Sequence, residues 1–279
     1  MFARERTGNE DQRGVSIIVP RPGSGSHLTV RVKRPAERRS SSRSATRALD
    51  LLELFGRAQR PLRAIEISRA LEMHSSTTNQ LLKTMVDSAH LVFDARAKTY
   101  LPSPRLTEFS AWIVESYGAD GRLRKLVEEL HAQTGLVVTV TTPNDLFMQI
   151  VDAEIPGIPG DERLPERGLQ VSIFGSAIGS AYLSTLEDDA VLRIAHRARI
   201  GEEDMRSLVD MAHRIRDEGF AEGPAAMDER TWSLAMPLPA QGLHVPAVLG
   251  LAGPSGVLKP RLDELANLMR DAVARWFGS

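Results

Sequence analysis

The sequence contains no cysteine in its 279 residues, and aromatic residues make up only 5% of it. The lack of cysteine excludes disulfides, thiolate metal sites and cysteine nucleophiles. No run of about 18 apolar residues occurs, so we expect no segment to span a membrane. The N-terminus has no apolar core of the kind found in signal peptides. These absences predict a soluble, cytoplasmic protein, and a hydrophobic content of 42% is enough for folded domains.

Patterns that mark common catalytic sites are missing as well. There is no P-loop and no Gly-x-Gly-x-x-Gly, and residues 175–179 are not a nucleophile elbow because the serine stands second rather than central. The seven histidines are scattered without the spacing of metal ligands. We therefore expect a protein that is not an enzyme and has neither a metal site nor a cofactor. An enzyme built on the C-terminal half is the alternative, which turnover of a bound small molecule would reveal.

The net charge of −1 is unevenly distributed along the chain. Residues 1–42 contain nine basic and four acidic residues, residues 43–110 ten and seven, and residues 111–279 sixteen and twenty-five. A basic N-terminal part and an acidic C-terminal part are typical of a nucleic-acid-binding module joined to a domain that binds no nucleic acid. Residues 1–42 are also rich in Arg, Ser, Gly and Pro. They predict a disordered basic arm, in which 15–19 and 28–32 have strand-like composition but little to pack against.

The stretch from residue 64 to residue 101 predicts two short helices followed by a β-hairpin. The first helix is expected over 64–71, and the second begins at Ser75 or Ser76, whose hydroxyl can cap it. Apolar residues recur at i, i+3 and i+4 along the second helix. Two short apolar segments around a polar turn then predict the hairpin. This order is typical of a winged helix-turn-helix, which we place at 43–104, with a long first helix over 44–55.

One face of the second helix carries short polar side chains and a single cation. Such side chains suit base edges and phosphates in a major groove, while a hairpin turn can contact the DNA backbone. The candidate DNA-binding residues are Arg47, Ser75, Ser76, Thr77, Asn79, Gln80, Lys83, Arg96 and Lys98. The alternative interpretation is an ordinary helical subdomain whose polar face is only solvated.

The rest of the chain predicts a linker helix within 105–122 and then a domain of mixed composition over 123–279. Helix patterns are expected at 123–134 and 258–276, at its two ends. The predicted strands between them are 136–141, 147–153, 171–174, 233–237 and 245–252. Strands flanked by helices at both ends indicate an α+β domain of the sensor type.

Several stretches match a known family in order and spacing. In the N-terminal half they are Ser44-Ala-Thr-Arg47-Ala-Leu-Asp50, residues 64–71, Ser75-Ser76-Thr77, Leu81-Leu82-Lys83-Thr84-Met85 and Tyr100-Leu101-Pro102-Ser103-Pro104-Arg105-Leu106. In the C-terminal half they are Gly179-x-Ala181-x-Leu183, Gly219-Phe220, Leu234-Ala235-Met236-Pro237 and Gly253-Pro254. On these residues the chain, from about 43 to 277, resembles the IclR-type transcriptional regulators.

The resemblance implies a mainly α N-terminal winged helix-turn-helix joined by a helix to an α+β, GAF-like C-terminal domain. It also implies a double-stranded DNA operator, a small organic acid as effector, and a homodimer or tetramer. One position departs from the family, whose members usually carry Arg where this chain has Gln80. Arg favours guanine and Gln pairs best with adenine, so the operator is expected to differ.

The candidate effector site combines a physical argument with the resemblance. Residues 175–177 stand at a strand-to-helix junction, where free backbone N–H groups and the helix dipole favour an anion. A tight turn that starts a helix needs the same residues, so a purely structural role is the alternative. The candidate effector-binding residues are Phe174, Gly175, Ser176, Ala177, Trp232, Ser233, Gly250 and Ala252.

Gly250 and Ala252 stand where many members of the family have serine, so this site has fewer hydroxyls. Such a pocket suits an aromatic or short acyl acid better than a small keto acid, although loss of the ligand is also open. The sequence thus predicts a sequence-specific DNA-binding transcriptional regulator controlled by a small organic acid. The alternative function is a sensor or scaffold that acts through protein contacts, with a degenerate DNA-binding or ligand-binding domain.

Overall fold

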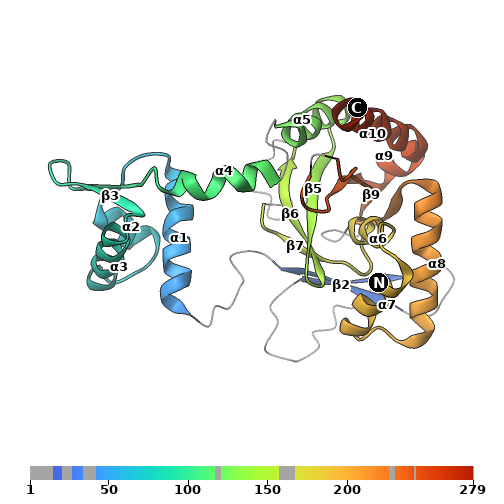
Figure 1. Cartoon of the computed structure of the whole chain (residues 1–279), viewed down its shortest axis with the longest axis horizontal. Coiled ribbons are helices and arrows are strands. Elements are labelled where there is room, and N and C mark those ends of the chain that lie inside the picture. The colour runs from blue at the N-terminus through green and yellow to red at the C-terminus, as the bar shows by residue number, and fades with distance from the viewer. Residues whose placement is uncertain are drawn as a thin grey trace. The chain divides into compact units, whose positions relative to one another are not determined.

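The computed structural model describes residues 15–20, 27–33, 42–116, 121–156, 167–225, 230–241 and 243–278 (Figure 1). The chain forms two compact units. One is Arg39–Glu115, and the other combines Met1–Arg38 with Ser116–Ser279. No helix in the described ranges has the length and apolar character needed to cross a membrane.

The unit Arg39–Glu115 is the predicted winged helix-turn-helix, followed by most of a further helix. Its elements are α1 Arg43–Ala58, α2 Ala64–Ala70, α3 Ser75–Asp87, β3 Leu91–Asp94, β4 Thr99–Pro102 and α4 Leu106–Ser116. β3 and β4 form the predicted hairpin. Leu62 adds a third short strand segment to it, because the N–H groups of Leu62 and Tyr100 donate to each other's carbonyl oxygens at 3.0 and 2.8 Å.

The core of this unit lies where α1, α2 and α3 meet the hairpin. Its buried side chains are Leu51, Phe55, Leu62, Ile67, Leu82, Met85 and Leu91. Leu49 on α1 and Ile65 on α2 are apolar but exposed, with 62% and 51% of their surfaces accessible to solvent. In a short helical unit the core reaches only one stripe of each helix, so a wide apolar pattern leaves residues outside it.

The second unit is built on one antiparallel sheet. Its strands are β1 Val15–Pro20, β2 His27–Lys33, β5 Val137–Asn144, β6 Phe147–Glu154, β7 Gln170–Ser172, β8 Ala221–Pro224, β9 Thr231–Pro237 and β10 Val248–Pro254. They lie in the order β1-β2-β7-β6-β5-β10-β9-β8. β8 is absent from the predicted strands because it is short, ends in Gly-Pro and is defined only by its pairing with β9.

Helices cover both faces of this sheet (Figure 1). α5 Arg122–Thr134 and α10 Leu262–Phe277 pack on one face, over Val138, Val140, Leu249 and Leu251. α6 Ala177–Leu183, α7 Asp188–Arg197 and α8 Glu202–Glu218 cover the other, over Met148, Ala235 and Val248. A short helix α9, Ser255–Leu258, and the 3-10 turn Lys259–Arg261 lead into α10. Strand residues alternate between the two cores, as the pleat requires, and the α+β fold predicted for this half is confirmed.

The structure differs from the prediction in the first 42 residues. β1 and β2 form an antiparallel hairpin, and β2 pairs with β7, placing Val32 opposite Val171 and Lys33 opposite Gln170. Val32 is 1% exposed. The strand-like segments of the expected arm therefore have a partner, the edge of β7, which lies about 140 residues away in sequence. Residues 1–14, 21–26 and 34–41 of the arm lie outside the described ranges.

Candidate nucleic-acid interface and effector site

The turn between α2 and α3 sets the direction of α3. Glu72 adopts a left-handed φ of 49°, and the Ser68 hydroxyl donates to the carbonyl oxygen of Met73 at 2.7 Å. α3 begins after His74, which has no side-chain cap, so the predicted capping by Ser75 or Ser76 is wrong. Both serines lie in the first turn of α3, where their hydroxyls are left for other partners.

α3 divides cleanly into a buried and an exposed face. Thr78, Leu82 and Met85 face the core, and the Thr78 hydroxyl donates to the carbonyl oxygen of His74 at 3.1 Å. The other face carries polar residues, of which Thr77 is half-buried. The exposed ones are Ser75, Ser76, Asn79, Gln80, Lys83 and Thr84. Among the described residues the side-chain amides of Asn79 and Gln80 make no hydrogen bond. Their donors and acceptors are thus presented to solvent on a rigid helix.

The hairpin carries the two predicted cations at its turn. The Asp94 carboxylate accepts the N–H groups of Arg96 and Ala97 at 2.8 and 3.0 Å, which folds the turn. Lys98 has a left-handed φ of 56° and leads into β4. Both Arg96 and Lys98 are exposed. Arg47 is half-buried on α1, so its guanidinium is less available than the two cations of the hairpin turn.

The candidate effector segment, 174–177, joins β7 to α6. Gly175 has a φ of 84°, a value that a glycine adopts without strain. The Ser176 hydroxyl accepts the N–H of Gly179 at 3.2 Å and donates to the carbonyl oxygen of Ser172 at 2.7 Å. Its side chain therefore serves as the N-cap of α6. The N–H groups of the first helical turn are the remaining donors at this junction, because they have no acceptor within the helix.

Three of the predicted effector residues lie on the sheet face that α6 covers. A side chain at Gly250 would meet the hydroxyl of Thr139 and a methyl group of Ile178, at 2.8 and 3.1 Å. Ser233 and Ala252 pair with each other on β9 and β10 and share this face, with the Ser233 hydroxyl donating to the carbonyl oxygen of Gly223 at 3.0 Å. The pairing of strands thus brings these positions to the same side of the sheet as the start of α6.

Trp232 does not lie on the sheet face that α6 covers. Neighbouring residues of a strand point to opposite faces, and Trp232 packs with the core under α5 and α10. Its indole N–H donates to Glu222 at 2.7 Å, and the ammonium group of Lys259 lies 3.7 Å from the centre of its ring. The effector-binding role predicted for Trp232 is therefore incompatible with a site lined by Ser233 and Gly250.

Thr139 and Ile178 are residues of this region that the sequence pattern did not single out. Thr139 is half-buried, and its hydroxyl has no hydrogen-bond partner among the described residues. The alternation of Val138 and Val140 places Thr139 on the opposite face from them. The register of β5 against β10 then sets it beside Gly250, which is information that only strand pairing provides.

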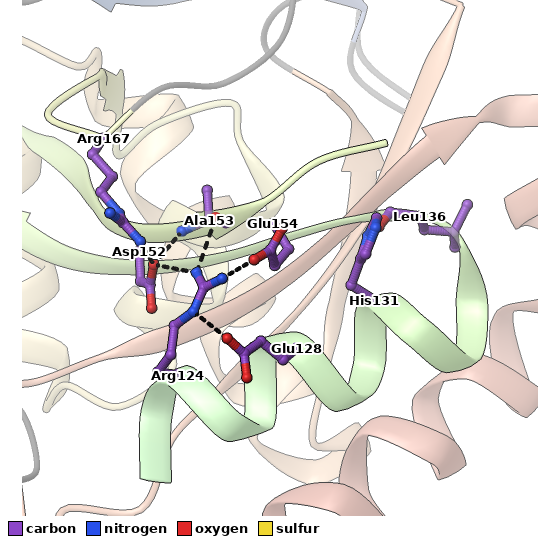
Figure 2. Close-up of polar contacts among 8 residues, drawn as sticks. All are labelled: Arg124, Glu128, His131, Leu136, Asp152, Ala153, Glu154 and Arg167. Carbon is purple, nitrogen blue, oxygen red and sulfur yellow. Dashed lines mark hydrogen bonds and ion pairs between the residues drawn. The ribbon is translucent and has the colours of Figure 1, made fainter. Parts of the chain in front are cut away.

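A cluster of charged residues lies on the other side of the sheet, between α5 and β6 (Figure 2). The Arg124 guanidinium donates to Glu128 at 2.7 Å and to Asp152 at 3.1 Å, and it also pairs with Glu154. Arg167 reaches the same oxygen of Asp152 at 2.6 Å. Two guanidinium groups and three carboxylates thus form one network of ion pairs that links α5 to β6. No group of acidic or histidine residues in the described ranges is arranged to hold a metal ion.

Part of the chain matches a known family model, and its fold matches solved structures. Residues 44–92 match the model of the IclR helix-turn-helix domain. None of the curated proteins compared matches the chain. The fold is similar to solved structures of transcriptional regulators.

One such structure is an IclR transcriptional regulator from Alicyclobacillus acidocaldarius, with a TM-score of 0.55 and 18% identity, over 86% of this chain and 100% of that one. Another is IclR from Thermotoga maritima, with a TM-score of 0.59 and 14% identity, over 85% and 99%. A third is an IclR homolog from Microbacterium hydrocarbonoxydans in complex with 4-hydroxybenzoate, with a TM-score of 0.56 and 16% identity, over 84% and 97%.

The matched residues 44–92 span α1, α2, α3 and the start of the hairpin, which are the elements that present the exposed amides of α3. The structural likeness extends from there across the antiparallel sheet and its covering helices. Residues 44–92 therefore match the IclR helix-turn-helix domain, and over most of its length the chain has the fold of solved IclR transcriptional regulators.

Proposed function

We propose that this protein is a sequence-specific, DNA-binding transcriptional regulator of the IclR type, controlled by a small organic acid. The observation that carries the DNA-binding half is the exposed face of α3. Asn79 and Gln80 are consecutive, exposed and without internal hydrogen bonds among the described residues. A helix of this kind enters the major groove, where side-chain amides reach base edges.

The proposed contacts follow from side-chain chemistry. Gln80 and Asn79 pair with the N6 and N7 atoms of adenine through two hydrogen bonds. Ser76 and Lys83 flank them by one turn on either side and contact phosphates or base edges. Arg96 and Lys98, at the hairpin turn, contact the sugar–phosphate backbone, which adds affinity without adding sequence preference.

The roles of Gln80 and Lys98 separate in a binding experiment. Selection from random duplexes followed by titration should show that Gln80→Ala loses about 1–3 kcal/mol for the preferred base at one position and relaxes the choice there. Gln80→Arg should change the preferred base at that position from adenine to guanine. Lys98→Ala should weaken binding to all sequences and lower the slope of log affinity against log salt by about 1.

Arg206→Ala provides the matched control, because Arg206 is an exposed arginine on α8, in the other unit of the chain. It should change neither the selected sequence nor the salt slope. If the wild-type chain selects no sequence and shows no salt-dependent binding, the regulator assignment fails. If Gln80→Ala leaves the selected sequence unchanged and Lys98→Ala leaves the salt slope unchanged, the assignment of these faces fails.

The effector proposal concerns the face of the sheet under α6. The N–H groups that start α6 and the hydroxyl of Thr139 are polar groups near the otherwise apolar residues Ile178 and Gly250. An apolar site with a few polar groups suits an aromatic carboxylic acid. The structural relative that binds 4-hydroxybenzoate supports this class of ligand.

A thermal-shift titration tests the effector proposal, since a ligand specific to the native state raises the melting temperature. 4-Hydroxybenzoate should raise the melting temperature of the wild-type chain. Thr139→Val, which replaces the hydroxyl by a methyl group of similar size, should weaken that shift. Thr185→Val, an exposed position after α6, should leave it unchanged. A panel of aromatic and aliphatic acids that gives no shift at millimolar concentration would refute the effector proposal.

A further inference from the structure

The N-terminal hairpin is attached to the edge of β7 by more than backbone pairing. β2 pairs with β7 at Val32 and Lys33. The N–H of Arg31 donates to the Ser172 hydroxyl at 3.1 Å, and the ammonium group of Lys33 lies 3.9 Å from the centre of the Phe147 ring. The hairpin thus contacts the last residue of β7, from which the candidate effector segment continues.

A chain of hydrogen bonds leads from the hairpin into that segment. The Ser172 hydroxyl, which accepts from Arg31, donates to the carbonyl oxygen of Phe174 at 3.0 Å. The carbonyl oxygen of Ser172 accepts from the Ser176 hydroxyl at 2.7 Å. Ser176 in turn caps α6 through the N–H of Gly179. Through its hydroxyl and its carbonyl oxygen, Ser172 therefore contacts both the N-terminal hairpin and the start of α6.

Apolar packing also connects the N-terminal hairpin to the start of α6. Val32 is 1% exposed and lies in a small core with Ile150, Leu169 and Val171. Ile178 packs against the same core, and its side chain also covers Gly250. Removal of Val32 from this core would open space under Ile178, because a void leaves the surrounding side chains without contacts on one side.

We propose that the β1–β2 hairpin is a β-augmentation partner for the β7 edge, and that its docking is coupled to the conformation of the segment from Ser172 to Gly179. Coupling of two sites is reciprocal: a docked hairpin orders the segment, and an ordered segment favours the docked hairpin. A ligand held at 174–178, which rests on the function proposed above, would therefore favour docking. Residues 34–41 follow β2 directly and lead to α1, so the hairpin gives the effector unit a second covalent connection to the DNA-binding unit.

Hydrogen–deuterium exchange of the full-length chain, without ligand, tests the coupling. Arg31→Pro removes the N–H that reaches Ser172, and Val32→Asp places a charge in the small core. Both should speed the exchange of backbone amides in 172–179 by at least tenfold. Arg31→Gln is the matched control, because it keeps the N–H and changes only an exposed side chain. It should leave those amides within twofold of wild type.

The reverse direction is tested from the other end of the hydrogen-bond chain. Ser176→Ala removes the hydroxyl that links Ser172 to α6 and should speed the exchange of β2 amides severalfold. Ser184→Ala is its control, since that buried hydroxyl donates to the carbonyl oxygen of Ala181 at the far end of α6. It should leave β2 unchanged. Amides of β10 report whether each variant keeps the fold of the sheet.

The coupling is refuted if Arg31→Pro speeds exchange in β2 while 172–179 keeps its wild-type rate. It is also refuted if the hairpin amides exchange at the rate of an unstructured chain in the wild type. If Val32→Asp disrupts the sheet, Val32→Ala replaces it, with a smaller acceleration in the same segment. None of these outcomes depends on DNA or effector, so failure of the regulator proposal and failure of this one are distinguishable.

Discussion

At Gly179 the backbone of α6 lies in close contact with the backbone of Ile173. A side-chain carbon there would lie 1.8 Å from the carbonyl oxygen of Ile173. That oxygen belongs to the backbone and cannot rotate away, so only glycine permits this approach. The approach keeps the first turn of α6 close to the end of β7 and positions Ser176 as the helix cap. The lack of a Cβ atom at Gly179 thus allows the candidate effector segment to lie close to the end of β7.

The substitution Gly179→Ala is expected to destabilise the effector unit by about 2–3 kcal/mol, since overpacking forces the backbone to shift. Thermal or chemical unfolding monitored by circular dichroism gives the change. Gly256→Ala in α9, where a side chain would meet nothing within 4 Å, is the control and should be neutral or slightly stabilising. Equal stability of the two variants would show that α6 does not pack on Ile173 in this way.

At the scale of elements, contacts between helices distant in sequence hold the effector unit together. Glu129 on α5 accepts a hydrogen bond from the indole N–H of Trp276 on α10 at 2.7 Å and also pairs with Arg275. Partial burial alone would raise the pKa of Glu129, but the hydrogen bonds from Trp276 and Arg275 outweigh it and lower the pKa below its usual 4.5. The carboxylate form therefore contributes to the docking of α10 on α5.

This lowered pKa predicts a pH dependence of stability. A carboxyl group with a lower pKa in the folded state stabilises the protein above its unfolded pKa, near 4.5, and loses this contribution as the pH falls through the folded value. Glu129→Gln should be less stable than wild type at pH 7. The difference should shrink as the pH falls below about 4.5.

Urea titrations of both proteins at pH 7 and at pH 3.5 provide the measurement. Trp276→Phe removes one of the hydrogen bonds to Glu129 and keeps the aromatic packing. Trp276→Phe should therefore lose part of the stability that Glu129→Gln loses, with the same dependence on pH. A difference between wild type and Glu129→Gln that is constant from pH 7 to pH 3 would contradict the assignment.

At the scale of the whole molecule, large apolar residues are exposed in the unit Arg39–Glu115. Leu49 on α1 and Trp112 on α4 are 62% and 64% accessible to solvent. Contiguous exposed apolar patches mark association sites, whereas singly exposed apolar side chains are common on protein surfaces. A DNA-binding helix on each of two chains reads two half-sites of an operator, so a second copy of this chain is the occupant that the proposed function requires.

We therefore expect a homodimer or a tetramer in solution. Leu49→Glu combined with Trp112→Glu should shift the dimer toward monomer and weaken operator binding at least tenfold, because two half-sites would no longer be bound together. Sedimentation velocity at several concentrations measures the association. Val257→Glu, at an exposed apolar residue of α9 in the other unit, is the control and should leave the dimer intact. A wild-type chain that stays monomeric at high micromolar concentration would contradict this expectation.

Local patterns were sufficient to predict much of this molecule. The helices around Leu51, Leu82 and Leu126, the hairpin after α3 and the strands that flank residues 144–147 follow from apolar periodicity and turn residues, which act over a few positions. The exposure of Asn79 and Gln80 follows from the same periodicity, because Thr78, Leu82 and Met85 must face the core. The fold class and the exposed polar face of α3 were therefore predictable from the sequence alone.

Only the tertiary structure decided which distant segments meet. Nothing local shows that Val32 would pair with Val171, that Thr139 would lie beside Gly250, or that Trp232 would pack against the core under α5 and α10. Leu49 and Ile65 have the right spacing for a core but lie beyond its reach. Strand register and core size depend on contacts between residues tens to hundreds of positions apart, and a pattern read over one or two turns carries no information about them.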